Sequence, residues 1–168
     1  GSEMCIRDRY NVCEVAKMIV YHGSNVRVES PKILSNGFYK DFGYGFYCTE
    51  IKRQAQRWAL SKRGDHVVSA YEYNEQPKLK IKKFDTMTDE WLDFIVRCRR
   101  GLTHNYDIVE GPMADDTIWD YIEDFVDGNI TREAFWELAR FRHPTHQIVF
   151  CTEEALHTIS FERSFTVE

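Results

Sequence analysis

Two segments of the sequence carry side chains that can bind a nucleotide. Tyr21-His22-Gly23-Ser24 puts an imidazole and a hydroxyl at the end of a predicted strand, where they can hydrogen-bond to a ribose or phosphate. Residues 41–49 combine two glycines with several aromatic rings. Glycine lets a backbone approach a ligand closely or turn sharply, and aromatic rings offer faces for a planar ring. Each segment also has a structural interpretation: a satisfied core histidine for the first, and a glycine-bent strand for the second.

Gln147 begins a run, Gln147 to Cys151, that is apolar on both faces and predicts a central buried strand. A polar amide at this position either satisfies a neighbour or faces a pocket. His143 and His146 lie just before Gln147 in the sequence, but no nearby carboxylate or cysteine completes a metal-binding set. We therefore interpret them as loop and surface histidines and predict no metal site.

Five cysteines form an odd and widely spaced set without a C-x-x-C pair, which indicates reduced thiols and a cytoplasmic protein. Gly1-Ser2 is typical of a remnant left by cleavage of an expression tag. We expect residues 1–17 to be a non-native leader and residues 18–168 to form a single domain. Cys5 and Cys13 then have no functional meaning.

The order of predicted elements favours an α+β fold with six or seven short strands and three or four helices. Thr88 and Thr131 are expected to cap helices, and Gly128 to end one. The strict strand–helix repeat of a doubly wound sheet is absent from this order. Strands are expected at 18–22, 41–49, 67–73, 79–84, 106–110, 147–151 and 158–167, and helices at 51–61, 88–98, 116–127 and 131–141.

Composition excludes several classes of protein. Hydrophobic residues make up 43% of the 168 residues, which rules out a disordered chain, and no apolar run approaches the ~20 residues of a membrane span. The net charge of −5 argues against a generic binder of phosphate backbones, although it leaves room for a local basic pocket. The sequence has no Walker loop, G-x-G-x-x-G, G-x-S-x-G or H-E-x-x-H motif.

Five segments in order resemble bacterial ADP-ribosyltransferase-like proteins, and most closely the uncharacterised family DUF3990. They span residues 18 to about 161 and read Y-H-G-S (21–24), D-F-G-Y-G-F-Y-C-T (41–49), E-W-L-D-F (90–94), Y-D-I-V-E-G-P-M-A-D-D (106–116) and Q-I-V-F-C-T-E-E-A-L (147–156). The resemblance implies a split pair of small antiparallel or mixed sheets with flanking helices and a cleft that holds NAD as co-substrate.

The same resemblance implies roles for individual residues. His22 would bind the adenosine-side ribose of NAD, with help from Ser24. Tyr47 would belong to an aromatic platform that stacks on nicotinamide, and Gln147 would occupy the place of the catalytic glutamate. The other expected cofactor contacts are Gly23, Arg27, Phe42, Gly43, Gly45, Phe46 and Thr49.

A glutamine in the glutamate's place changes the chemistry. It can accept a hydrogen bond from the ribose hydroxyl, but it brings no charge to stabilise an oxocarbenium-like sugar and cannot act as a base. Asp115, Asp116 and Glu153 are candidate substitutes, and the two aspartates are equally explained as helix N-terminal charges. Arg97, Arg99 and Arg100 are best explained as partners of a helix C-terminus.

The function expected from the resemblance is transfer of ADP-ribose from NAD to a protein or nucleic-acid acceptor, in a toxin, antiphage effector or phage-encoded modifier. The acidic composition disfavours nucleic acid as the acceptor. The alternatives are NAD glycohydrolysis, a catalytically silent nucleotide-binding module, and a domain that acts only with a partner or as a module in an operon. Expression beside a neutralising protein would indicate the last of these. The sequence leaves the oligomeric state open.

Overall fold

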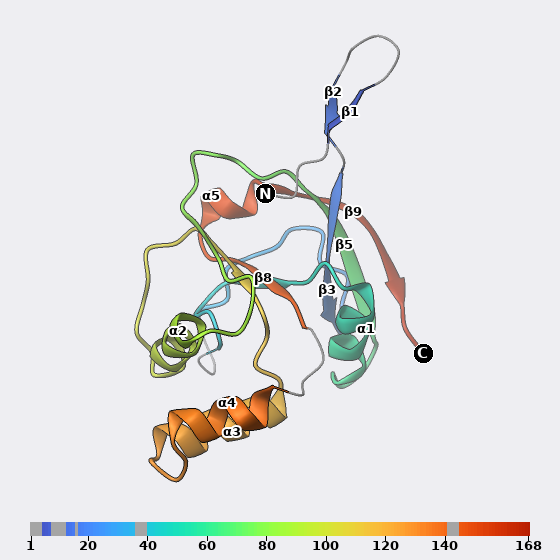
Figure 1. Ribbon diagram of the computed structural model, residues 1–168. Coiled ribbons are helices and arrows are strands. Elements are labelled where there is room, and N and C mark those ends of the chain that lie inside the picture. Colours follow the sequence, from blue (N-terminus) through green and yellow to red (C-terminus); the bar gives the residue numbers. More distant parts are fainter. Residues whose placement is uncertain (1–4, 8–12, 16, 36–39, 141–144) are drawn as a thin grey trace. The chain divides into compact units, whose positions relative to one another are not determined.

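The computed structural model describes residues 5–7, 13–15, 17–35, 40–140 and 145–168. These residues form nine strands and five helices in mixed order (Figure 1). The chain divides into two compact units, one made of Gly1–Pro31, Cys48–Lys78 and His157–Glu168, the other of Lys32–Tyr47 and Leu79–Leu156. A sheet of three strands and a separate sheet of four confirm the predicted α+β class with two small sheets.

The three-stranded sheet of the first unit is antiparallel, with β5 (Val67–Tyr73) between β3 (Met18–Ser24) and β9 (Ile159–Thr166). Helix α1 (Lys52–Leu60) packs on β3 through the small side chains of Ala55 and Ala59. A Cβ atom at Gly23 would lie 2.1 Å from the Ala55 carbonyl oxygen, so the helix can approach the strand only because this residue is a glycine.

Two further strands lie in the part of the sequence that we interpret as a leader. β1 (Cys5–Arg7) and β2 (Cys13–Val15) pair antiparallel. Residues 1–4, 8–12 and 16 of this segment, and His143 further along the chain, lie outside the described residues. The non-native origin of residues 1–17 therefore stays a prediction.

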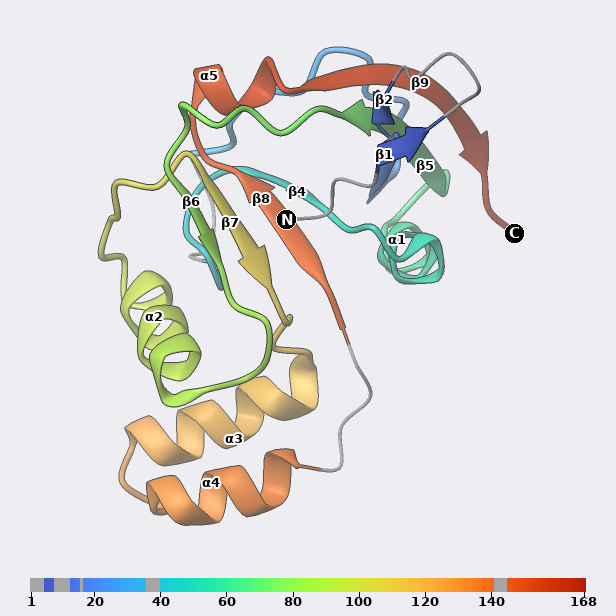
Figure 2. The same ribbon diagram turned by 45° about the horizontal axis from the view of Figure 1, so that its top comes forward.

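The sheet of the second unit is mixed, in the order β4 (Phe46–Cys48), β8 (Gln147–Phe150), β7 (Ile108–Gly111) and β6 (Ile81–Lys83) (Figure 2). β6 and β7 run parallel, and β7 and β8 antiparallel. All four residues of β8 are buried, which confirms the predicted central strand.

Three helices of the second unit begin where the sequence predicts. Thr88 caps α2 (Asp89–Arg99), and Thr131 caps α4 (Arg132–Ala139). α3 (Asp116–Val126) is followed by Gly128, whose φ of +79° suits a residue just after a helix. α3 and α4 lie side by side in both views (Figures 1 and 2). Helix α5 (Glu153–Leu156) was not predicted.

The largest core of the second unit lies between its helices and one face of its sheet. Its fully or nearly fully buried members are Phe42, Phe84, Trp91, Leu92, Ile95, Val109, Ala114, Ile118, Ile122, Phe135, Ala139 and Val149. None of the helices formed by the described residues is long and apolar enough to cross a membrane.

Candidate functional site

The first predicted nucleotide-binding segment forms the end of β3. Side chains alternate between the faces of a strand, so His22 and Ser24 lie on one face and can contact the same ligand. His22 is half-buried and lies opposite Ser69 in β5. Gly23 faces the other way, against α1, so this glycine is explained by the packing of the helix on the strand.

Arg27, predicted to bind a phosphate of NAD, is held by neighbours in the same unit. Its guanidinium makes an exposed ion pair with Glu29 at 2.7 Å and lies 4.9 Å from the centre of the Phe161 ring. Exposed ion pairs are worth little, typically below ~1 kcal/mol, so an incoming phosphate can replace Glu29 at small cost.

The aromatic segment contributes more to the core than to an open platform. Phe42 is 0% exposed and packs against Phe84 and Phe94, with ring centroids 6.0 and 5.9 Å away. Phe46 is buried too. Thr49 has no exposed surface, and its hydroxyl accepts a hydrogen bond from the backbone N–H of Ile51. The structure thus places these three side chains inside the protein, where a cofactor would reach them only if the surrounding packing opened.

Tyr47 closes the turn formed by the same segment. Its hydroxyl donates to the Gly43 carbonyl at 2.6 Å and accepts from the Phe42 N–H at 3.1 Å. Burial raises the pKa of Tyr47 well above its usual value, so the phenol stays neutral at physiological pH. The ammonium of Lys40 lies over the Tyr47 ring, 4.9 Å from its centre, in a cation–π contact.

Glycine is required at the two positions of this segment for different structural reasons. Gly43 has a φ of +82°, a backbone conformation that favours glycine. A Cβ atom at Gly45 would lie 2.8 Å from the Phe150 carbonyl oxygen, so this residue must be small for the chain to lie against β8. Neither position requires a ligand to explain its glycine.

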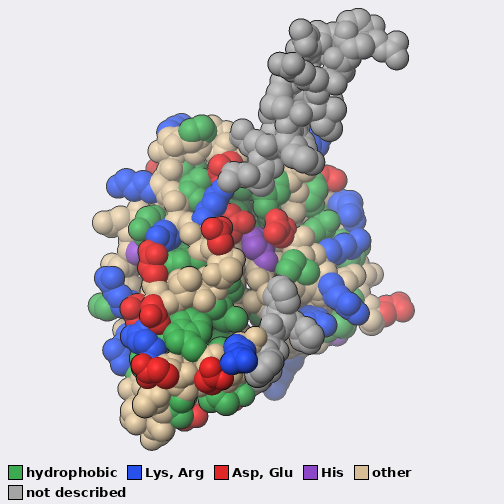
Figure 3. Space-filling view, viewed as in Figure 1, with side chains coloured by type: hydrophobic (Ala, Val, Ile, Leu, Met, Phe, Trp, Pro, Cys, Tyr) green, Lys and Arg blue, Asp and Glu red, His purple; other side chains and the backbone are tan. Residues whose placement is uncertain are grey.

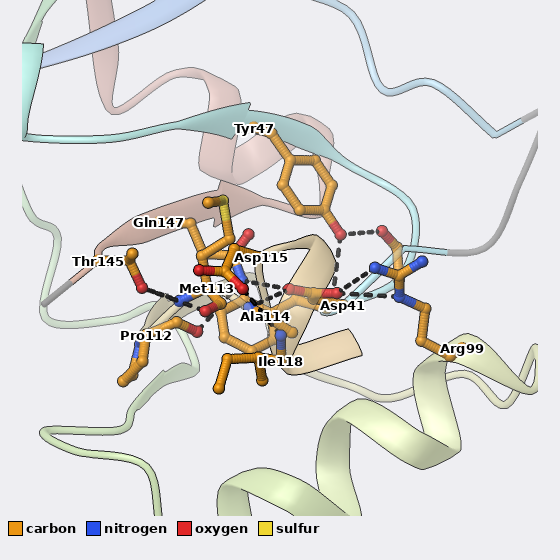
Figure 4. A network of polar contacts seen from close by, with 12 residues as sticks. Asp41, Tyr47, Arg99, Pro112, Met113, Ala114, Asp115, Ile118, Thr145 and Gln147 are labelled. Carbon is orange, nitrogen blue, oxygen red and sulfur yellow. Dashed lines mark hydrogen bonds and ion pairs between the residues drawn. The ribbon is translucent and has the colours of Figure 1, made fainter. Parts of the chain in front are cut away.

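Gln147 satisfies a buried neighbour, one of the two interpretations that the sequence left open. It is 2% exposed, and its Nε2 donates to Asp41 Oδ2 at 3.1 Å and to the Pro112 carbonyl at 3.3 Å (Figure 4). Because a carboxylate only accepts hydrogen bonds, Asp41 determines which end of the amide faces it. Among the described residues, none donates a hydrogen bond to Gln147 Oε1.

Asp41 is the centre of this network, and sequence reasoning missed its role. It is 4% exposed and also accepts from Arg99, whose Nη2 and Nε lie 2.7 and 2.9 Å from Oδ1, and from the Ala114 N–H at 2.8 Å. Arg99 therefore pairs with a buried carboxylate, in addition to its place in the last turn of α2. The Asp41 carboxylate thus connects four segments of the second unit.

The other face of the same sheet carries a carboxylate–imidazole pair. Glu110 Oε1 and His146 Nε2 are 2.9 Å apart, and their side chains are 20% and 12% exposed. The prediction that His146 is a surface histidine is therefore wrong. Gln147 points to the helix-covered face with Val149, whereas Glu110 pairs in register with Ile148 and so projects to the opposite face.

The remaining acidic candidates are explained by helix ends. Asp115 caps α3, because its Oδ1 accepts from the Ile118 N–H at 2.8 Å. Asp116 and Glu153 are exposed in the first turns of α3 and α5. All three side chains suit the positive end of a helix dipole.

A cavity of about 450 Å³ opens in the second unit and is lined by Gly43, Tyr44, residues 101–106, Lys80, Cys98, Cys151 and Thr152. His104 accepts from the Tyr106 N–H at Nδ1 (3.1 Å), and its Nε2 lies 2.8 Å from the Phe42 carbonyl. These two partners fit a neutral ring with its proton on Nε2. Burial raises the pKa of Cys151 to about 12, which makes this thiol a poor nucleophile.

Comparison with known proteins identifies a family. A family model described as "Protein of unknown function (DUF3990)" matches residues 18–161, the same range over which the five segments lie. No curated protein and no solved structure matches the chain. The matched range covers most of the 168 residues, and the chain belongs to the DUF3990 family.

Proposed function

We propose that the protein is an NAD-dependent ADP-ribosyltransferase, which moves ADP-ribose from NAD to a macromolecule and releases nicotinamide. The five segments that resemble such transferases support the proposal, and so does an architecture of two small sheets. In this proposal His22 and Ser24, side by side on one face of β3, bind the cofactor.

The reaction breaks the bond between the ribose C1′ and the nicotinamide nitrogen, and nicotinamide leaves with the bonding electron pair as a neutral molecule. A nucleophilic atom of the acceptor forms the new bond to C1′, and its proton passes to a base. A carboxylate that accepts a hydrogen bond from the ribose stabilises the positive charge that develops on the sugar. Gln147 has no charge to contribute to this step.

One observation carries the assignment of the missing charge, namely the Glu110–His146 pair. Its carboxylate belongs to the 106–116 segment of the resemblance, is mostly shielded from water, and lies on the sheet face opposite Asp41 and Gln147. Charges act more strongly where water is excluded. We assign to Glu110 the stabilisation of the sugar and to His146 the acceptance of the acceptor's proton.

The test measures nicotinamide release from NAD by the purified protein, with and without a bacterial lysate, and the transfer of radiolabel from NAD to macromolecules. Glu110→Gln should lower release at least 100-fold, as expected for loss of a charged catalytic group, and should leave NAD binding within threefold. His22→Ala should instead weaken NAD binding. Glu123→Gln, at an exposed carboxylate of α3, is the matched control and should leave release unchanged. Equal rates for Glu110→Gln and the wild type would overturn the assignment.

The Gln147 amide donates a hydrogen bond to Asp41, and this favours one alternative, a catalytically silent nucleotide-binding module. Calorimetric binding of NAD without nicotinamide release in either condition would identify that module. Release of free ADP-ribose without lysate would identify a glycohydrolase. Absence of both binding and release would refute NAD as the ligand.

A further inference from the structure

One stretch of the first unit, which comprises helix α1 and the residues just after it, is rich in cations. Residues 51–64 contain five cationic side chains and no acidic one, in a chain whose net charge is −5. Lys52, Arg53 and Arg57 belong to α1, and Lys62 and Arg63 follow its end. We refer to these five residues as the basic face. The composition of the whole chain conceals it, because the rest of the sequence is more acidic than the total.

The basic face is directed to solvent. With 3.6 residues per turn, Arg53 and Arg57 lie on the side of α1 away from Ala55 and Ala59, which pack against the sheet. Lys52, in the first turn, lies nearer the sheet side and reaches the Phe165 ring. All five side chains are exposed. Within the described part of the chain, none of the five takes part in an ion pair with an acidic residue. Figure 3 shows Lys and Arg side chains, in blue, where α1 and β9 lie in Figure 1.

Aromatic rings lie among these cations. The Lys52 ammonium is 4.8 Å from the centre of the Phe165 ring in β9, and the guanidinium of Arg163 is 5.3 Å from the same ring. Phe165 and Trp58 are both partly exposed. Cations interleaved with aromatic side chains are the combination that binds single-stranded nucleic acids, since phosphates pair with the cations and bases stack on the rings.

We infer that the basic face binds the phosphate backbone of a single-stranded nucleic acid. α1 is nine residues long, or about 13 Å at 1.5 Å per residue, which accommodates two or three successive phosphates. The helix covers the sheet face opposite His22, so a strand bound on its outer side leaves His22 and Ser24 uncovered. The inference concerns binding and goes beyond the proposed transferase function, because it requires no NAD.

The test measures binding of a fluorescein-labelled 20-nucleotide single-stranded RNA, and of the DNA of the same sequence, to the full chain without NAD. Fluorescence anisotropy is recorded from 50 to 300 mM salt. Lys52→Gln, Arg53→Gln and Arg57→Gln are combined in one variant, since glutamine keeps the helix propensity and removes the charge. The matched control combines Lys78→Gln, Arg97→Gln and Arg100→Gln, exposed cations elsewhere that bring the same change in net charge.

The wild type should bind at 50 mM salt, and the affinity should fall steeply as salt rises. The α1 variant should bind at least tenfold more weakly, and its salt slope should fall by about 2, at 0.7 for each of three single-strand phosphate contacts. The control should bind like the wild type. Absence of binding at 50 mM salt, equal loss in the two variants, or equally tight binding of polyglutamate would each overturn the inference. Loss of nicotinamide release with retained RNA binding would refute the proposed function alone.

Discussion

At the scale of single residues, the carboxylate of Asp41 is the most constrained group of the candidate site. Its oxygens accept from Arg99, from the Ala114 N–H and from Gln147 while it is almost completely buried. A buried charge is tolerated when it is paired and hydrogen-bonded, and becomes costly when a partner is lost. The chemistry available at position 147 therefore depends on Asp41.

Gln147→Glu should destabilise the protein in a pH-dependent way. The new carboxylate would face Asp41, now 3.1 Å from Nε2, and repulsion between two carboxylates raises the pKa of one of them. A raised pKa in the folded state means that the destabilisation is small below the unfolded value of about 4.3 and grows as pH rises. Urea unfolding should show a loss of about 2 kcal/mol at pH 7 and less at pH 4.5.

Gln76→Glu, in an exposed turn, is the control for this pH series. It should leave stability within about 0.5 kcal/mol at both pH values. A pH-independent loss for Gln147→Glu would show that the new carboxylate does not face Asp41.

Asp41→Asn should lower the free energy of unfolding by about 3 kcal/mol, because Arg99 loses its charge partner and an amide N–H comes to face other donors. Thermal and urea unfolding measure the loss. Asp65→Asn, at an exposed carboxylate, should cost less than about 0.5 kcal/mol. Similar values for the two variants would argue against the network as a source of stability.

The sequence predicts the burial of Gln147 but not its partner. A polar residue at the start of an all-apolar run indicates that some neighbour must satisfy it, whereas Asp41 lies 106 positions away along the chain. Local patterns carry no information about such a pairing. His146 was missed for the same reason, since its carboxylate partner is 36 positions away.

At the scale of elements, one side chain joins β6, β7 and the start of α5. Asp107 precedes β7, and its carboxylate accepts from the Lys80 N–H at 2.9 Å and from the Thr152 hydroxyl at 2.7 Å. The backbone hydrogen bond from Lys80, then the Thr152 hydroxyl, lower the pKa of Asp107. Its ionised form is thus stabilised in the folded protein.

Asp107→Asn should cost about 1 kcal/mol at pH 7, the usual value of a lost hydrogen bond. A carboxyl whose pKa is depressed on folding stabilises the protein above its unfolded pKa of about 3.9, and this contribution disappears as pH falls through the folded value. The difference between wild type and variant should therefore shrink between pH 5 and pH 2.5 in urea unfolding. A difference that stays constant over this range, or one matched by Asp85→Asn at an exposed site, would contradict the assignment.

Helix ends were predictable because their chemistry is local. The hydroxyls of Thr88 and Thr131 accept backbone N–H groups three residues later, as their positions before apolar periodic segments predict. α5 escaped prediction because four residues are too few for a periodic pattern, although Thr152 accepts from the Ala155 N–H in the same way.

At the scale of the whole molecule, neither compact unit is continuous in the sequence. The second unit takes Lys32–Tyr47 from a part of the chain separated from Leu79–Leu156 by 31 residues of the first, Cys48–Lys78. That early segment supplies Asp41 to the polar network and Phe42 to the core. A fragment with only the later segment therefore lacks parts of both.

A fragment comprising residues 79–156 should not fold cooperatively. Loss of Phe42 opens a void in the core, and Arg99 and Gln147 lose their buried partner, at a cost of several kcal/mol that exceeds the usual margin of a small domain. Near-ultraviolet circular dichroism and thermal unfolding report the result. The control joins residues 32–47 to 79–156 through a flexible Gly/Ser linker and should regain cooperative unfolding. A cooperative transition in the shorter fragment would contradict the prediction.

The Asp41–Gln147 hydrogen bond has a consequence for how related sequences can diverge. Two ionised carboxylates cannot share this buried place, so positions 41 and 147 are expected to vary together. A relative with glutamate in place of Gln147 should carry a neutral side chain in place of Asp41. The glutamine is then the side chain that fits beside a buried aspartate, and the residue type at position 147 depends on position 41.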